Sequence, residues 1–197
     1  MASDETLASP ARQPAGRSAS ARCYDRQMKA FDLLGLDVRG LGEEDGPEID
    51  ALLVRCAEFM RMSEGQDPIR GDGLPLLEER PEEAPEVEKQ VLGLFDGPCL
   101  VGVLDLLKDY PAEETWYLGL MLIEPARRRE GLGTAVFAAL REWLTAQGAL
   151  RLRLAVVDEN AAGHRFWIRQ GFRELGTVEQ DLGHFRRTLH RMERALI

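Results

Sequence analysis

Three consecutive arginines stand directly before a glycine pair in a chain whose formal net charge is -9. The segment "RRREGLGT" covers residues 127–134, and the apolar residues after it recur at helical spacing. At a helix start, the first N–H groups lack intrahelical partners and the helix dipole favours negative charge. Gly131 and Gly133 let an anion approach the backbone closely, while arginine adds charge-assisted hydrogen bonds and Thr134 adds a hydroxyl. These residue types in this order predict a phosphate-binding site.

Two established phosphate-binding motifs do not fit this segment. The dinucleotide fingerprint GxGxxG needs a third glycine and an acidic residue about twenty positions later, and only Gly131 and Gly133 are present. A P-loop needs GxxxxGK followed by Ser or Thr, which the chain lacks. For the segment taken alone, the simpler alternative is a turn, a helix cap and a solvated run of charge.

A second segment, "NAAGHRFWIRQGF" at residues 160–172, follows the next predicted strand. Together the two segments resemble the signature motifs of the GNAT superfamily of N-acetyltransferases. Arg128-x-x-Gly131-x-Gly133 is similar to the acetyl-CoA motif of that family. The second signature is matched by Asn160, Gly163, Phe166, Trp167, Gly171 and Phe172. The resemblance covers residues 31–197 as one GNAT domain and leaves residues 1–22 as an N-terminal tail, for which we expect disorder.

The resemblance implies both a fold and a function. The implied fold is α/β, a single domain with a mixed, twisted and splayed central sheet and helices on both faces. The implied function is transfer of an acetyl group from acetyl-CoA, with no metal, to a primary amine of a small molecule or peptide by direct attack. The alternative is a non-catalytic GNAT-like module that binds acyl-CoA as a sensor or interaction domain.

The resemblance also assigns cofactor-binding residues by position. In the family, the strand before the first motif separates from the adjacent strand, and the unpaired backbone of this first strand binds the pantetheine arm. This role falls on Met121, Leu122 and Ile123. The pyrophosphate loop falls on Arg128, Arg129, Glu130, Gly131, Leu132, Gly133 and Thr134. Asn160 lies near the pantetheine in relatives, and we expect Trp167 beside the thiol arm.

The catalytic residues do not follow from the sequence. Many relatives have, at the position of Trp167, a tyrosine that protonates the leaving thiolate, and an indole is no useful acid at neutral pH. The strand at residues 116–123 carries no carboxylate, although many relatives keep a base there. Asp105, Asp109 and Tyr110 end the preceding strand and are candidates by proximity, with a turn or rim position as the alternative.

The first elements that lead to these motifs are predicted from periodicity. A strand is expected over Phe31–Leu41, and a helix begins at Pro47 with apolar positions at helical spacing up to Met60. Residues 63–73 are predicted as a loop. Residues 77–88 include six glutamates and form either a solvated connector or an acidic rim that attracts a cationic acceptor.

The central elements are a hairpin followed by a β-α-β unit. Two apolar runs flank Asp96-Gly97, which is a hairpin signal. Residues 114–125 are almost continuously apolar, so this strand is expected in the middle of the sheet and ends at Pro125. We expect the sheet to split after Ile123. The later elements are a helix over 134–148, a strand over 150–158, a helix over 160–171 and two final strands.

Composition limits the class of protein. The 197 residues contain 44% apolar residues, yet no run of about 18 apolar residues that a membrane helix needs. Residues 1–22 lack the apolar core of a secretory signal. The net negative charge disfavours binding to nucleic acid or an anionic membrane and suits a cationic small molecule or peptide. A homodimer is a further expectation.

Cysteine and histidine spacing predicts no metal centre. Cys23, Cys56 and Cys99 are odd in number and show no CxxC pair, which indicates a reducing, cytoplasmic compartment. The three histidines, His164, His184 and His190, show no metal-ligand spacing. His164 shares a predicted helical face with Asn160 and Trp167, although a solvated histidine is the simpler interpretation.

Overall fold

A computed structural model of the chain describes residues 29–33 and 35–197. The tail predicted over residues 1–22 lies outside the described residues. No helix in the described part is long and apolar enough to cross a membrane.

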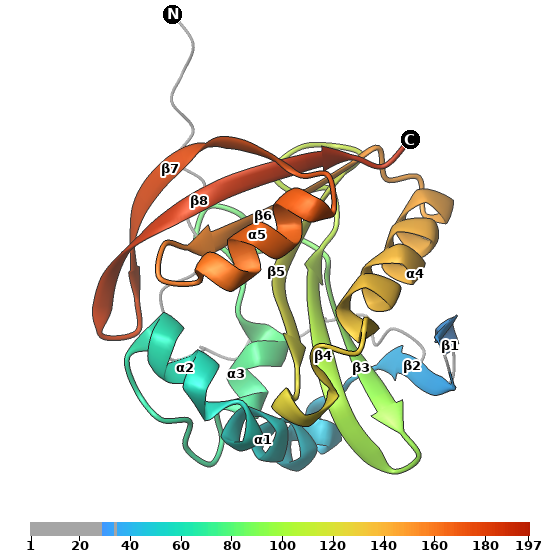
Figure 1. Ribbon diagram of the computed structural model, residues 1–197, viewed down its shortest axis with the longest axis vertical. Coiled ribbons are helices and arrows are strands. Elements are labelled where there is room, and N and C mark those ends of the chain that lie inside the picture. The colour runs from blue at the N-terminus through green and yellow to red at the C-terminus, as the bar shows by residue number, and fades with distance from the viewer. Residues whose placement is uncertain (1–28, 34) are drawn as a thin grey trace, which may run out of the picture.

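Eight strands form one sheet in the order β1-β2-β3-β4-β5-β6-β8-β7 (Figure 1). The strands are β1 (Lys29–Leu33), β2 (Leu36–Gly40), β3 (Lys89–Asp96), β4 (Cys99–Leu107), β5 (Thr115–Ile123), β6 (Arg151–Val157), β7 (Arg173–Leu182) and β8 (Phe185–Ala195). Among the described strands, only β5 and β6 pair in parallel. The mixed α/β sheet, the hairpin around Asp96-Gly97 and the central position of β5 are therefore confirmed.

The helices cover both faces of the sheet, as predicted. They are α1 (Gly46–Arg55), α2 (Ala57–Glu64), α3 (Gly73–Glu78), α4 (Leu132–Ala146) and α5 (Ala161–Arg169). One buried cluster joins α4 and α5 to the sheet through residues such as Phe137, Trp116 and Leu104. A second cluster joins α1 and α2 to the other face through residues such as Leu52 and Val103. Val103 and Leu104 are neighbours on β4, and their opposite directions follow from the pleat of the strand.

The N-terminal region differs from the prediction in three places. The single strand expected over Phe31–Leu41 is a hairpin, because Gly35 has a φ of 82° and Leu33 pairs with Leu36. The helix expected from Pro47 breaks at Cys56, whose N–H still bonds to carbonyls of α1 before α2 begins. The short helix α3 begins at the last residue of the predicted loop. Its six residues are too few to show helical periodicity in the sequence.

The sheet opens earlier than predicted. β5 pairs with β6 only from Thr115 to Leu118, whereas it stays paired with β4 as far as Ile123. The parting therefore begins after Leu118 and not after Ile123. A bulge marks the place, because Leu118 and Leu120 oppose consecutive residues of β4 and leave Gly119 without a partner there. A bulge bends its strand and increases the local twist, which turns β5 away from β6.

Candidate active site

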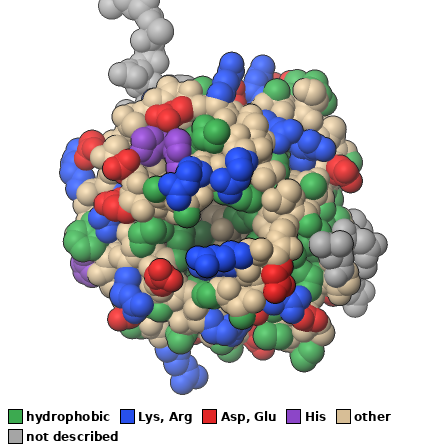
Figure 2. All heavy atoms as spheres, in the orientation of Figure 1, with side chains coloured by type: hydrophobic (Ala, Val, Ile, Leu, Met, Phe, Trp, Pro, Cys, Tyr) green, Lys and Arg blue, Asp and Glu red, His purple; other side chains and the backbone are tan. Residues whose placement is uncertain are grey.

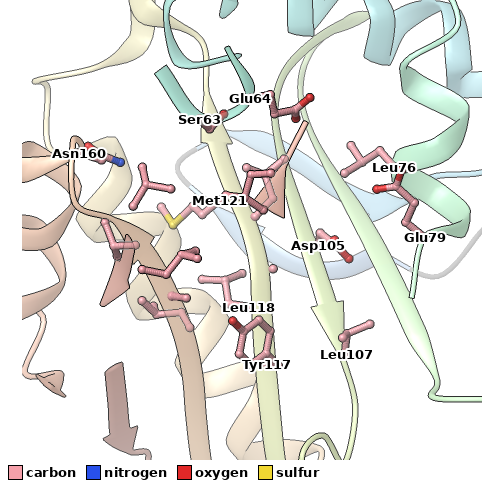
Figure 3. Close-up of a pocket in the computed structure, with 18 of the residues that line it drawn as sticks. Ser63, Glu64, Leu76, Glu79, Asp105, Leu107, Tyr117, Leu118, Met121 and Asn160 are labelled. Carbon is pink, nitrogen blue, oxygen red and sulfur yellow. The ribbon is translucent and has the colours of Figure 1, made fainter. Parts of the chain in front are cut away.

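A cavity of about 240 Å³ lies where β5 and β6 part (Figure 3). Its walls come from residues 117–121 of β5, residues 154–157 of β6, helices α2 and α3, and the β7–β8 turn. We call this cavity the cleft. Figure 3 shows Met121 and Tyr117 on β5, with Asn160 on one side of the strand and Asp105 on the other. The cleft thus joins the α5 side of the sheet to the side covered by α1, α2 and α3.

The three β5 residues expected at a pantetheine arm are placed differently from one another. Met121 lines the cleft. Leu122 is buried in the cluster under α1 and α2, and Ile123 is buried in the cluster of the opposite face. The Ile123 carbonyl also accepts a hydrogen bond from Arg128 Nε at 2.7 Å. The part of β5 that faces the cleft is therefore residues 117–121, around the bulge.

The Arg-Gly loop forms the start of α4, as its sequence predicts. Gly131 is the N-cap with a φ of 81°, and a Cβ added to it would have no heavy atom within 4 Å. At Gly133, an added Cβ would make only ordinary contacts, 3.5 Å from Phe166. The protein's own packing therefore does not demand a glycine at residue 133. Space beside the first-turn N–H groups, together with the helix dipole, fits an anionic group.

The three arginines before this loop have different surroundings. Arg127 pairs with Asp96 at 2.6 Å. Arg128 donates to Ile123 O and lies 3.8 Å from Cys56 Sγ, so it ties the loop to the end of β5. Arg129, with a φ of 69°, has an exposed side chain with no hydrogen-bond or ion-pair partner among the described residues. Arg129 is therefore the arginine of the three whose guanidinium is available to a ligand.

The remaining loop residues divide between surface and core. Glu130 and Thr134 are exposed, and the Thr134 hydroxyl accepts a hydrogen bond from Gln170, the C-cap residue of α5, at 3.3 Å. Leu132 is buried in the core under α4. Figure 2 shows a hollow in the middle of this face, over the gap between α5 and the end of β5, with Lys or Arg side chains on its border. Positive charge at this border complements an anionic ligand.

Asn160 caps α5 and lines the cleft. Its Oδ1 accepts a hydrogen bond from Gly163 N at 2.9 Å. A Cβ on Gly163 would lie 2.5 Å from Asn160 Nδ2, so glycine is required for this cap. The second motif therefore contains a structural pair, in which residue 163 leaves room for the side chain of residue 160 beside the cleft.

Trp167 is a core aromatic residue with an edge on the cleft. It is buried, and its ring contacts Phe137, Phe166 and Phe172 with centroids 4.8 to 5.6 Å apart. Phe166 lies on α5, Phe172 lies just after α5, and Phe137 lies on α4. These three contacts fix the indole in place. Its position fits a residue that shapes the cleft wall.

Asp105 lies in neither a turn nor the rim of the cleft, so the simpler alternative that the sequence left open for it is wrong. It lies within β4, is 9% exposed and lines the cleft. Its Oδ2 pairs with Lys89 Nζ at 3.0 Å, and its buried Oδ1 has no hydrogen-bond partner among the described residues. Burial raises the pKa of this carboxyl, although Lys89 opposes the rise. Asp105 thus has an unpaired carboxylate oxygen at the cleft, and the pKa of this carboxyl is raised.

The other two candidates beside Asp105 behave differently from each other. Asp109 sits in the turn after β4, where its Oδ1 accepts from Glu114 N at 2.9 Å, so the turn alternative holds for Asp109. Tyr110 is buried and lines the cleft, and its hydroxyl donates to Glu83 at 2.5 Å. Burial and this bond raise the pKa of Tyr110. His164 contacts Glu174 instead of the cleft.

The family to which the chain belongs follows from comparison with known proteins. The model of the acetyltransferase (GNAT) family matches residues 52–172, which is more than half of the chain. The chain belongs to the GNAT family. Members of this family are acetyltransferases that use acetyl-CoA. No protein among those with curated descriptions matches this sequence significantly.

Solved structures show the same fold. An acetyltransferase from Thermus thermophilus is 25% identical with a TM-score of 0.67, over 83% of this chain and 98% of that one. A ribosomal-protein-alanine N-acetyltransferase from Brucella melitensis is 22% identical with a TM-score of 0.58, over 80% and 98% of the two chains. The acetyltransferase yncA from Salmonella typhimurium, solved with its cofactor acetyl-CoA, is 16% identical with a TM-score of 0.59, over 83% and 95%.

In this GNAT protein, the cleft contains residues that sequence reasoning missed. Tyr117 of β5 lines the cleft beside Tyr110, with ring centroids 5.7 Å apart, and burial raises its pKa to about 12. Lys89 is almost fully buried and bonds to Glu79 O as well as to Asp105. The available signal was the lone carboxylate in the apolar run "LVGVLDLL", since a charge inside a buried strand needs a partner or a function.

Acidic groups outnumber basic ones in the wall of the cleft. Glu64, Glu79 and Asp105 line it, and Lys89 is the one Lys or Arg among the described lining residues. Lys89 is paired with Asp105, and Glu64 and Glu79 have interaction partners of their own. Three acidic lining residues against one basic residue suit a cationic ligand on the side of α2 and α3.

Proposed function

We propose that this GNAT acetyltransferase moves an acetyl group from acetyl-CoA to the primary amine of a cationic small molecule or peptide. One observation carries the proposal: a helix start with the geometry for an anion lies next to Met121, at the cleft where β5 and β6 part and where three acidic residues line the wall. The first favours the phosphates of the donor, and the second favours an ammonium group of the acceptor. The two substrates would thus approach from opposite sides of the sheet.

The fit of CoA is supported by residues of this chain. The first-turn N–H groups after Gly131, the open space at Gly131 and the available guanidinium of Arg129 would hold its pyrophosphate. The edge of β5 next to the bulge has lost its β6 partner and would bind the pantetheine arm with backbone groups. Asn160, Met121 and Trp167 would border this arm, because all three line the cleft.

Asp105 is the group that we propose to receive the proton of the acceptor. An ammonium has no lone pair and must lose a proton before its nitrogen attacks the thioester carbonyl carbon. Asp105 offers an unpaired Oδ1, and its raised pKa makes it a stronger base than an ordinary aspartate. As the new C–N bond forms, the C–S bond breaks and the thiolate departs, with its proton coming from solvent because Trp167 is no acid.

A release assay for free thiol tests the proposal. The purified chain is supplied with acetyl-CoA and one of three acceptors of similar size: a diamine, a monoamine or a diol. The acidic cleft predicts the highest kcat/KM for the diamine, a lower value for the monoamine and no transfer to the diol. Transfer to the diol at the diamine's rate, or CoA binding without thiol release from any amine in a broader panel, would contradict the proposal.

A further inference from the structure

Two of the three histidines meet outside the cleft, on the α5 face of the sheet. His164 of α5 and His190 of β8 have ring centroids 4.9 Å apart. Glu174 of β7 contacts both, with Oε2 3.3 Å from His164 Nε2 and Oε1 3.0 Å from His190 Nδ1. The sequence spacing predicted no metal-ligand cluster among the histidines. The prediction missed this group because its members lie on three elements that only the β6-β8-β7 order brings together.

The donor atoms have the chemistry and spacing of a transition-metal site. Imidazole nitrogens with a carboxylate oxygen are ligands of Zn²⁺ and related divalent ions. Two ligands bound at about 2.1 Å to one tetrahedral ion lie roughly 3.4 Å apart. The two His-to-Glu174 contacts fall near this value, and the three donor atoms all lie within 4.8 Å of one another. Small side-chain rotations therefore bring them onto one ion.

Asp158 supplies the outer partner that metal-bound histidines usually have. Its Oδ1 lies 2.8 Å from His190 Nε2, the ring nitrogen that faces away from Glu174. A carboxylate there holds a proton on Nε2 and leaves the Nδ1 lone pair for a metal. The two carboxylates of Glu174 and Asp158 also give this cluster negative charge, which favours a cation.

Ions can reach this cluster from solvent. The side chains of His164, His190 and Glu174 are 29%, 21% and 39% exposed. Figure 2 shows histidine side chains gathered beside acidic ones on this face of the molecule. Exposure also leaves room for water as a fourth ligand.

The geometry points to a binding site for one divalent transition-metal ion, Zn²⁺ by its ligand chemistry, held by His164 Nε2, His190 Nδ1 and Glu174. The ion would tie α5 to the β7–β8 hairpin. Because α5 carries Trp167 and begins next to Asn160, the ion would stiffen one wall of the cleft. The site is separate from acetyl transfer and does not depend on the proposed acceptor.

Calorimetric titration of the full chain with Zn²⁺ tests the site. We expect saturable binding of one equivalent to this cluster. His164→Gln and His190→Gln should each remove that equivalent. Asp158→Asn should weaken it about 10- to 100-fold, the usual cost of losing an outer partner. His184→Gln is the matched control, because His184 bonds to Gln66 and lies outside the cluster, and it should bind as the wild type does.

Several outcomes would overturn the site. These are the absence of saturable Zn²⁺ binding, equal binding by the wild type and the His164 and His190 variants, or equal loss in the His184 variant. A Co²⁺ spectrum of the wild type gives a second readout that needs no variant. We expect visible bands of tetrahedral nitrogen and oxygen ligation, and a thiolate charge-transfer band would place the ion on a cysteine instead. Zn²⁺ should also raise the Tm of the wild type but not that of the double histidine variant.

Discussion

Asp105 shows how one residue takes its chemistry from its surroundings. Its carboxyl is buried in β4, which raises its pKa, while Lys89 opposes the rise at 3.0 Å. A raised pKa means that the folded chain holds this proton more tightly than the unfolded chain. The stability from this group is therefore present below the unfolded pKa and is lost as pH rises through the folded pKa. The same group becomes a base only above its folded pKa.

The first prediction concerns Asp105→Asn. We expect kcat/KM for amine acetylation to rise with pH through the Asp105 pKa in the wild type. In the asparagine variant, kcat/KM should no longer rise with pH in this range. It should also fall by about 10²-fold or more, the scale of losing a general base. Its amide oxygen still accepts from Lys89, and unfolding with urea checks that the fold is kept. Asp109→Asn is the matched control and should retain the wild-type profile, because Asp109 only caps the nearby turn. An unchanged profile in the Asp105 variant would remove Asp105 from the mechanism.

The second prediction concerns Trp167, which differs from the tyrosine of many relatives. Trp167→Phe keeps an aromatic ring against Phe137 and Phe172, so most of the turnover should remain. Trp167→Ala leaves a cavity in the core and should lower the free energy of unfolding by about 3–5 kcal/mol. Thermal melts and kcat for both variants check this. A fall in kcat of about 10²-fold in a stable Phe variant would give the indole N–H a chemical role that we deny it.

At the scale of elements, the start of α4 decides how the donor binds. A Cβ at Gly133 makes ordinary contacts, and an acidic residue in a first helical turn suits the helix dipole. Gly133→Asp should therefore keep the fold and its stability, yet it should abolish CoA binding by filling the approach and repelling phosphate. Ala138→Asp is the control, because residue 138 is exposed on the same helix beyond its first turn. Calorimetry with CoA checks both variants. Equal affinity in the two would mean that the phosphates do not bind at the start of α4.

The cap of α5 gives the fourth prediction. In Gly163→Ala, the new methyl would lie 2.5 Å from Asn160 Nδ2 and would displace the capping side chain. Loss of a cap costs about 0.5–2 kcal/mol, and the better helix propensity of alanine offsets about 1 kcal/mol of this. Stability should thus change little, while CoA affinity falls because Asn160 no longer borders the cleft. Urea unfolding and calorimetry separate the two effects. Unchanged affinity would mean that Asn160 has no part in binding.

For the whole molecule, the sequence predicted what local patterns specify. The apolar run of β5 placed it in the sheet centre, and the hairpin signal at Asp96-Gly97 placed β3 beside β4. The Gly-rich loop predicted the helix start at Leu132 within two residues. These features follow from periodicity, turn chemistry and burial, which act within a few residues of chain.

The features that the sequence did not predict depend on contacts between distant residues. Gly119 lies at the bulge where the sheet opens, but a glycine inside a strand signals either a bulge or a close approach, and the sequence does not say which. Asp105 is buried in β4 beside Lys89, so the turn or rim alternative for this candidate was wrong. The cluster of His164, Glu174 and His190 similarly needs the sheet order to exist.

The central claim is that donor and acceptor meet where β5 and β6 part, and a crystal structure with CoA tests it most directly. We expect the pyrophosphate within hydrogen-bond distance of the N–H groups of residues 131–134. The pantetheine arm should run along β5 beside Asn160, and the thiol should open into the cleft toward Asp105. Pyrophosphate bound away from the start of α4, or a thiol outside the cleft, would contradict the account.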